Sequence, residues 1–94
     1  MSKEVVSIYK TIDKHVKNLE YENAIENYNK IIELNPPDIN KYYKELGEIY
    51  ETQKMVYKAV ECYVKVLKTE TNISTIGVLT NQIGTCYFNI QQFK

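Results

Sequence analysis

The chain has 94 residues, of which 44% are hydrophobic and 26% charged, and its twelve basic residues balance twelve acidic ones. This size and composition indicate one small globular domain and exclude a disordered polypeptide. The zero net charge and the use of Lys at every basic position argue against a nucleic-acid partner, because Arg supplies most phosphate and base contacts.

Five stretches of the chain repeat an apolar residue every three or four positions, which is the spacing of one face of an α-helix. They predict helices at about residues 3–18, 21–34, 38–53, 56–70 and 74–91. The second helix must end before Pro36 and Pro37, because proline cannot continue a helix, and Asp38 can cap the third helix. Asn72 stands where the cap of the fifth helix is expected.

Two segments of the chain repeat each other. Residues 56–69 align with residues 21–34 at an offset of 35 residues, and both segments keep the spacing Ala-x-x-x-Tyr. The segment Leu46-Gly47-x-x-Tyr50 returns as Ile83-Gly84-x-x-Tyr87 at an offset of 37 residues. Two helices in each unit of about 35 residues is the layout of a helical solenoid.

These repeats resemble the tetratricopeptide repeat family. Its units carry an aromatic residue, Leu-Gly and Tyr on the first helix, then Ala-x-x-x-aromatic on the second helix and a closing Pro. The motifs Tyr43-x-x-Leu46-Gly47-x-x-Tyr50 and Ala59-x-x-x-Tyr63 fit this pattern at the family spacing. An earlier unit keeps only the second half of the pattern, in Ala24-x-x-x-Tyr28 and Pro36.

A third unit keeps Ile83-Gly84-x-x-Tyr87 and Phe93 but has Thr80 in place of the aromatic residue. The resemblance implies an all-α fold, a right-handed helical-repeat solenoid of antiparallel helix pairs with about five helices. It also implies a single domain over residues 1–94 and a fragment of a longer array. The units of that domain are expected at residues 5–38, 40–73 and, in part, 77–94.

In this family small residues let paired helices approach, and aromatic residues fill the space around them. We therefore expect Gly47 and Ala59 to mark a close contact between helices. The tyrosines at pattern positions are expected in the core: Tyr28, Tyr43, Tyr50, Tyr63 and Tyr87. Three tyrosines outside the pattern are expected to be freer: Tyr9, Tyr42 and Tyr57.

The resemblance implies a non-catalytic module that binds a peptide or partner protein in a concave groove lined by the first helix of each unit. The candidate groove residues are Tyr9, Asp13, Lys41, Lys44, Glu48, Asn81, Gln82, Thr85 and Phe88. Val6, Val16, Glu51 and Asn89 fall on the same predicted faces. Related domains clamp a chaperone C-terminal tail with Lys, Asn and Arg, and Glu45, Glu48 and the lack of Arg argue against that ligand.

Two other functions stay open at this point. The connection before the third unit is longer than a 34-residue period requires, as in the regulatory domains of peptide-sensing transcription factors. An alternative hypothesis is therefore that the chain is the ligand-sensing regulatory domain of a larger regulator. It is also a candidate self-association module that pairs through the exposed end of its last helix, at Ile83, Tyr87 and Ile90.

The sequence offers little for catalysis or cofactor binding. His15 is the only histidine, and Cys62 and Cys86 lack the spacing of metal or redox pairs. Three glutamates on the third predicted helix are close enough to raise one another's pKa: Glu45, Glu48 and Glu51. A solvated face is the simpler interpretation, so we expect no enzyme activity, cofactor or metal. Since no apolar run approaches a membrane span and the first residues lack a signal-peptide core, a cytoplasmic location is expected.

Overall fold

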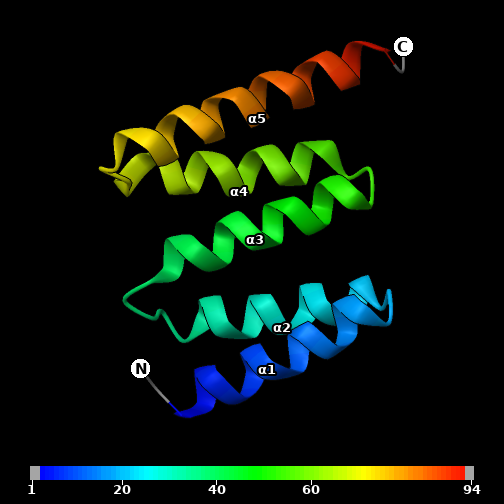
Figure 1. The fold of residues 1–94 in the computed structure, drawn as a ribbon, viewed down its shortest axis with the longest axis vertical. Coiled ribbons are helices and arrows are strands. Elements are labelled where there is room, and N and C mark those ends of the chain that lie inside the picture. Colours follow the sequence, from blue (N-terminus) through cyan, green and yellow to red (C-terminus); the bar gives the residue numbers. More distant parts are fainter. Residues whose placement is uncertain (1–2, 93–94) are drawn as a thin grey trace. The chain divides into compact units, whose positions relative to one another are not determined.

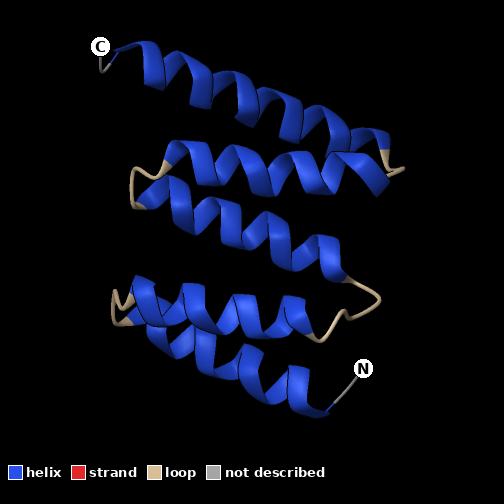
Figure 2. Cartoon of the chain, turned by 180° about the vertical axis from the view of Figure 1, so that it is seen from behind, coloured by secondary structure: helices blue, strands red, loops and turns tan. Residues whose placement is uncertain are grey.

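The computed structural model describes residues 3–92 of the chain, and the side chains of residues 3–90. Within these residues it contains five α-helices and no strand (Figures 1 and 2). The helices are α1 (Lys3–Lys17), α2 (Tyr21–Glu33), α3 (Ile39–Thr52), α4 (Val56–Thr69) and α5 (Ile73–Gln92). The predicted all-α fold is confirmed, and every predicted helix end lies within one residue of the observed one. Phe93, which belongs to the third predicted unit, lies outside the described residues.

The helices fall into two compact units that meet within α3, between Tyr42 and Tyr43. The first unit contains α1, α2 and the first turn of α3. There α1 and α2 run antiparallel and pack along each other (Figure 1). Their facing sides supply the core of this unit, at Val5, Ile12, Ala24, Tyr28 and Ile31.

The second unit contains the rest of α3, with α4 and α5. The contact between α3 and α4 is close at Gly47, because a Cβ atom built there would lie only 2.5 Å from Cε1 of Tyr63. Ala59, one turn before Tyr63, is fully buried. The prediction that Gly47 and Ala59 mark a close helix contact is confirmed. On its other side α4 packs against α5, which buries Leu79 and Cys86.

Three of the turns between helices place a residue other than Gly in the left-handed backbone region. Leu19 has φ 60°, Asn35 has φ 51° and Lys54 has φ 64°. After α1, the Leu19 N–H donates to the Val16 carbonyl at 3.0 Å and the Glu20 N–H to the His15 carbonyl at 2.8 Å. This pair of bonds satisfies the last carbonyls of α1 and reverses the chain toward α2. Leu19 itself is 71% exposed, so its side chain gains little from packing there.

The start of α5 is capped as predicted. The Asn72 side-chain oxygen accepts a hydrogen bond from the Thr75 N–H at 3.0 Å, and the Asn72 carbonyl accepts one from the Ile76 N–H at 3.0 Å. These bonds satisfy backbone donors in the first turn of the helix, which otherwise lack partners.

Two predictions about tyrosines are wrong. Tyr42, expected to be free, is fully buried, with its ring 5.5 Å from the ring of Tyr9. Tyr87, expected in the core, is 53% exposed, because no described helix covers its side of α5. Ile83 and Ile90, expected with Tyr87 at an exposed helix end, are only partly exposed. The predicted exposed surface therefore includes Tyr87 but not these two isoleucines.

We expect Gly47→Ala and Gly84→Ala to change stability in opposite directions. At Gly47 the added methyl group overlaps the Tyr63 ring, which should cost about 1 to 3 kcal/mol. At Gly84 an added Cβ meets nothing within 4 Å, so the better helix propensity of Ala should stabilise the chain by about 1 kcal/mol. The urea midpoint followed by circular dichroism checks both. Equal shifts for the two variants would contradict the close contact at Gly47.

Replacement of Leu19 by Gly should stabilise the chain by about 1 kcal/mol, because Gly adopts the left-handed conformation without a steric penalty. Leu34→Gly is the matched control, since Leu34 ends α2 with φ −76°. There Gly gains no such relief, and the control should lower stability by about 1 kcal/mol. Thermal unfolding of both variants measures the difference, and a lower midpoint for Leu19→Gly would refute the strain at this turn.

Candidate partner-binding surface

In the first unit the structure brings together two of the predicted groove residues, Tyr9 and Lys41. The Lys41 Nζ atom lies 4.5 Å from the centroid of the Tyr9 ring. The edges of the same ring meet Tyr28 at 6.5 Å and Tyr42 at 5.5 Å between centroids. Tyr9 therefore joins a small aromatic cluster with one face turned to a cation, an attraction typical of Lys over an aromatic ring.

Asp13, the other candidate of this unit, forms an ion pair along its own helix. Its Oδ2 atom lies 3.2 Å from the Nζ atom of Lys17, four residues later. Both side chains are more than two thirds exposed, so the pair is screened by water and contributes little to stability.

In the second unit the predicted residues Lys44 and Glu48 lie one turn apart on α3. Burial raises the pKa of the Glu48 carboxyl, Lys44 opposes this shift, and the carboxylates of Glu45 and Glu51 raise the pKa further. The predicted mutual influence of the three glutamates is therefore confirmed for Glu48. The part of α3 in the second unit thus carries three carboxylates and the ammonium group of Lys44.

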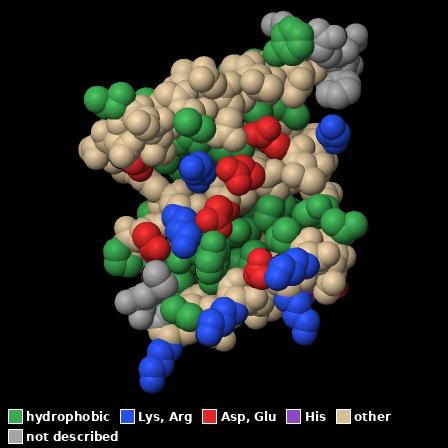
Figure 3. Space-filling view, in the orientation of Figure 1, with side chains coloured by type: hydrophobic (Ala, Val, Ile, Leu, Met, Phe, Trp, Pro, Cys, Tyr) green, Lys and Arg blue, Asp and Glu red, His purple; other side chains and the backbone are tan. Residues whose placement is uncertain are grey.

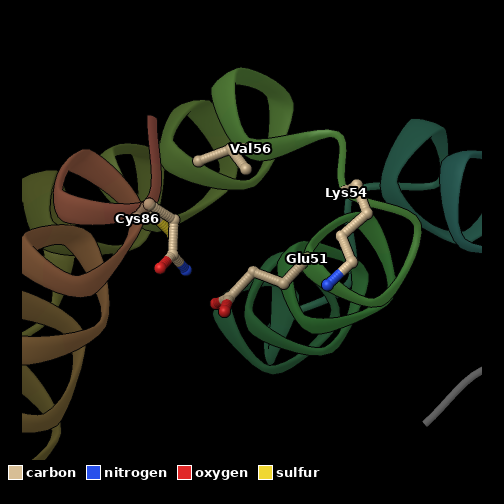
Figure 4. A pocket seen from close by; sticks show the side chains of 5 residues that line it. Glu51, Lys54, Val56 and Cys86 are labelled. Carbon is tan, nitrogen blue, oxygen red and sulfur yellow. The ribbon is translucent and has the colours of Figure 1, made fainter. Parts of the chain in front are cut away.

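A pocket of about 120 Å³ lies beside this part of α3 (Figure 4). Five residues from the three helices and a connecting turn line it: Glu51, Lys54, Val56, Cys86 and Asn89. Figure 4 shows the Glu51 side chain extending toward Cys86. A carboxylate, an ammonium group and a side-chain amide therefore meet around one small space.

Glu51 is the centre of the polar contacts in this pocket. Its Oε1 atom accepts a hydrogen bond from the Tyr63 hydroxyl. Burial raises the pKa of Tyr63, and the bond to Glu51 raises it further. Burial likewise raises the pKa of the Cys86 thiol, with Glu51 adding to the effect. Both groups are therefore protonated at neutral pH, and Cys86 lacks the thiolate form that a nucleophile needs.

The predicted residues of α5 do not share one face, because successive helical residues are about 100° apart. Asn81, Thr85 and Phe88 form one exposed stripe, in which the Thr85 hydroxyl donates to the Asn81 carbonyl at 3.0 Å. Gln82 lies on the side that also carries Asn89. Its Oε1 atom is buried and accepts no hydrogen bond from the described part of the chain. Because this oxygen is buried, it is not open to a ligand in this structure.

Sequence reasoning placed Glu51 and Asn89 on the groove but missed three lining residues. The sequence indicated of Cys86 only that it lacks the spacing of a metal or redox pair. Lys54 and Val56 lie at the turn into α4 and at its first residue, outside the first helices that the family pattern indicates. The backbone of Lys54 adopts the left-handed conformation, which sets the direction of this turn. The sequence did not indicate this conformation, because the residue is Lys rather than Gly.

A comparison with models of protein families identifies the family to which the chain belongs. The model of the tetratricopeptide repeat matches residues 17–38 and 41–72, together more than half of the chain. The chain belongs to the tetratricopeptide repeat family. The second match contains the close contact of Gly47 with Tyr63, the feature that most resembles the family pattern. Neither the curated proteins nor the solved structures gave a significant match.

Tetratricopeptide repeats generally mediate protein–protein interactions and are themselves non-catalytic. Figure 3 shows the kind of surface available for such contacts, with acidic and basic side chains interspersed among apolar ones on the face drawn there. Of the helices described, none is long and apolar enough to cross a membrane.

We expect Glu51→Gln to speed the reaction of Cys86 with an aromatic disulfide reagent at pH 8. Burial and the Glu51 carboxylate both hold the thiol protonated, so removing the charge lowers its pKa and increases the thiolate fraction. A Cys62→Ala background leaves Cys86 as the single thiol. The pH at half-maximal labelling rate, followed by absorbance, should move down.

Glu61→Gln in the same background is the control, because Glu61 is exposed on α4 and does not line the pocket. Its labelling midpoint should stay where it is in the parent. If both substitutions shift the midpoint equally, Glu51 has no special influence on Cys86.

Proposed function

We propose that the chain is a non-catalytic interaction module and that its second unit binds a segment of a partner protein at the pocket of Glu51, Lys54 and Asn89. The observation that carries this proposal is the meeting of these three polar groups in one space of about 120 Å³. That volume exceeds the room a single water molecule needs. It fits a polar side chain or a peptide group of a bound segment.

The three groups complement both halves of a peptide bond. The Lys54 ammonium and the Asn89 amide nitrogen donate hydrogen bonds to a carbonyl oxygen, while Glu51 and the Asn89 oxygen accept them from an N–H group. Glu51 uses Oε1 for Tyr63, and a carboxylate has acceptor positions for several donors. The pocket therefore favours a polar, uncharged group over a simple cation or anion.

Further contacts follow along α3. Lys44, Glu48 and Glu51 recur at intervals of four and three residues, so they form one stripe on that helix. A segment seated at Glu51 and lying along this stripe would next meet Glu48 and then Lys44. Binding of an extended segment, rather than a single small molecule, suits this row of one basic and two acidic side chains.

The pocket groups favour recognition over chemistry. Tyr63 and Cys86 both have raised pKa values and stay protonated at neutral pH. Neither is thereby activated as a nucleophile. The single-domain organisation, the ligand-sensing alternative and the contribution of Tyr9, Asp13 and Lys41 to partner binding remain predictions.

Peptides selected on the wild-type chain by phage display should bind the double variant Glu51→Gln with Asn89→Ala at least about tenfold more weakly. The loss of two hydrogen bonds, one of them to a charged group, accounts for a change of that size. Fluorescence anisotropy with the labelled peptides gives the dissociation constants.

The control double variant is Glu61→Gln with Asn29→Ala, which changes the same residue types at exposed positions on α4 and α2. It should keep the wild-type affinity. A library that yields no binders, or an equal loss of affinity for both double variants, would remove the pocket as the binding site.

A further inference from the structure

Two opposite charges face the pocket of the second unit without forming an ion pair. Glu51 and Lys54 are three residues apart, a spacing at which side chains of a continuous helix can meet. However, α3 ends at Thr52, and Lys54 adopts the left-handed conformation with φ 64°. The ion pairs in the described part of the chain include neither residue. The turn therefore leaves a carboxylate and an ammonium group beside the same space of about 120 Å³.

The pocket has a buried inner side and an exposed rim. Cys86 is 1% exposed, and Glu51 and Val56 are partly exposed. Lys54 and Asn89 are both exposed. Figure 4 shows the Glu51 side chain extending from α3 toward the buried Cys86. This arrangement suits the end of a side chain better than a stretch of main chain, because a main chain must continue in two directions.

The Glu51 carboxylate already receives donors from the protein. The Tyr63 hydroxyl donates a hydrogen bond to its Oε1 atom. Burial raises the pKa of the Cys86 thiol, and the charge of Glu51 and a hydrogen bond to it raise this pKa further. These two donors offset part of the negative charge of the carboxylate. Since a carboxylate has about four acceptor positions, Glu51 can accept another N–H group without the need for a full positive charge.

A neutral group with both a donor and an acceptor complements the two charges at once. A ligand carboxylate would be repelled by Glu51, and a ligand ammonium group by Lys54. A primary carboxamide presents an N–H for Glu51 and a carbonyl oxygen for Lys54 on one carbon atom. The Asn89 side-chain oxygen can accept its second N–H, and Val56 offers apolar surface to its methylene stem. A main-chain peptide group has a single N–H and would leave one of these acceptors unused.

We infer that the pocket recognises the side-chain carboxamide of a Gln or Asn in the bound segment. Glu51 and Asn89 accept its two N–H groups, and Lys54 donates to its carbonyl oxygen. This inference rests on the proposed function and adds the residue type that the partner segment must carry. A Glu or Asp at the same place in the segment would have nearly the same shape but would carry the charge that Glu51 repels.

The test titrates propionamide, which is the side chain of Gln, into the isotope-labelled full chain and follows nuclear magnetic resonance spectra. The Asn89 side-chain amide and the Cys86 backbone amide should shift in a saturable way. Propionate, propylammonium and N,N-dimethylpropionamide should each bind at least about tenfold more weakly. The first two carry a charge that the pocket repels, and the third has no N–H for Glu51. Equal affinity for any of the three would overturn the inference.

Lys54→Met keeps the length of the side chain and removes its charge. Because Glu51 then carries the remaining charge of the pocket lining, this variant should bind propylammonium more tightly than propionamide. Lys68→Met is the matched control, since Lys68 is exposed on α4 and does not line the pocket. It should keep the wild-type preference for propionamide. If Lys54→Met keeps that preference as well, Lys54 does not contact the ligand and the inference is wrong.

Peptides selected on the chain separate this inference from the proposed function. Replacement of Gln and Asn by Glu and Asp in such peptides should weaken binding at least about tenfold. Peptides that bind through Glu51 and Asn89 yet keep their affinity after this exchange would overturn the inference and leave the proposed function standing. A chain that prefers propionamide but binds peptides away from the pocket would overturn the proposed function and leave the carboxamide preference standing.

Discussion

The close approach of α3 and α4 at Gly47 is the contact on which the second unit depends. Because position 47 has no side chain, the Tyr63 ring lies directly against the α3 backbone. The Tyr63 hydroxyl then reaches Glu51, one turn further along α3, and donates a hydrogen bond to it. The absence of a side chain at Gly47 thereby lets α3 and α4 come close and positions the Glu51 carboxylate at the pocket.

The position of Glu51 explains why the pocket suits recognition. Burial and the Glu51 carboxylate together raise the pKa values of Tyr63 and Cys86, and the carboxylate still has acceptor positions to offer in the pocket. A reactive site would need the reverse arrangement, in which a cation or a helix N-terminus stabilises a thiolate. Lys54 lies at the pocket, but burial and Glu51 raise the Cys86 pKa despite it. The protonated states of Tyr63 and Cys86 therefore agree with the non-catalytic interaction role of the family.

Local pattern predicted the helices and the Gly47 contact, because both depend on residues a few positions apart or on a repeated motif. Burial of individual side chains was harder to predict, since it depends on neighbours distant in sequence. Tyr42 lies outside the family motif, yet the Tyr9 ring of α1 packs against it. Tyr87 lies within the motif, yet no described helix covers it. The pocket was missed in part because Lys54 enters it through a left-handed turn that lacks the usual Gly.

The two faces of α5 differ in burial for one physical reason. A repeat helix must bury one side against the preceding helix, and α5 does so through Leu79 and Cys86. Its other side repeats the α3 pattern that accepts a following helix, with Gly84 at the contact position. Cys86 also lines the pocket, whereas Gly84 and Tyr87 do not, so the two sides of this 20-residue helix differ both in burial and in their position relative to the pocket.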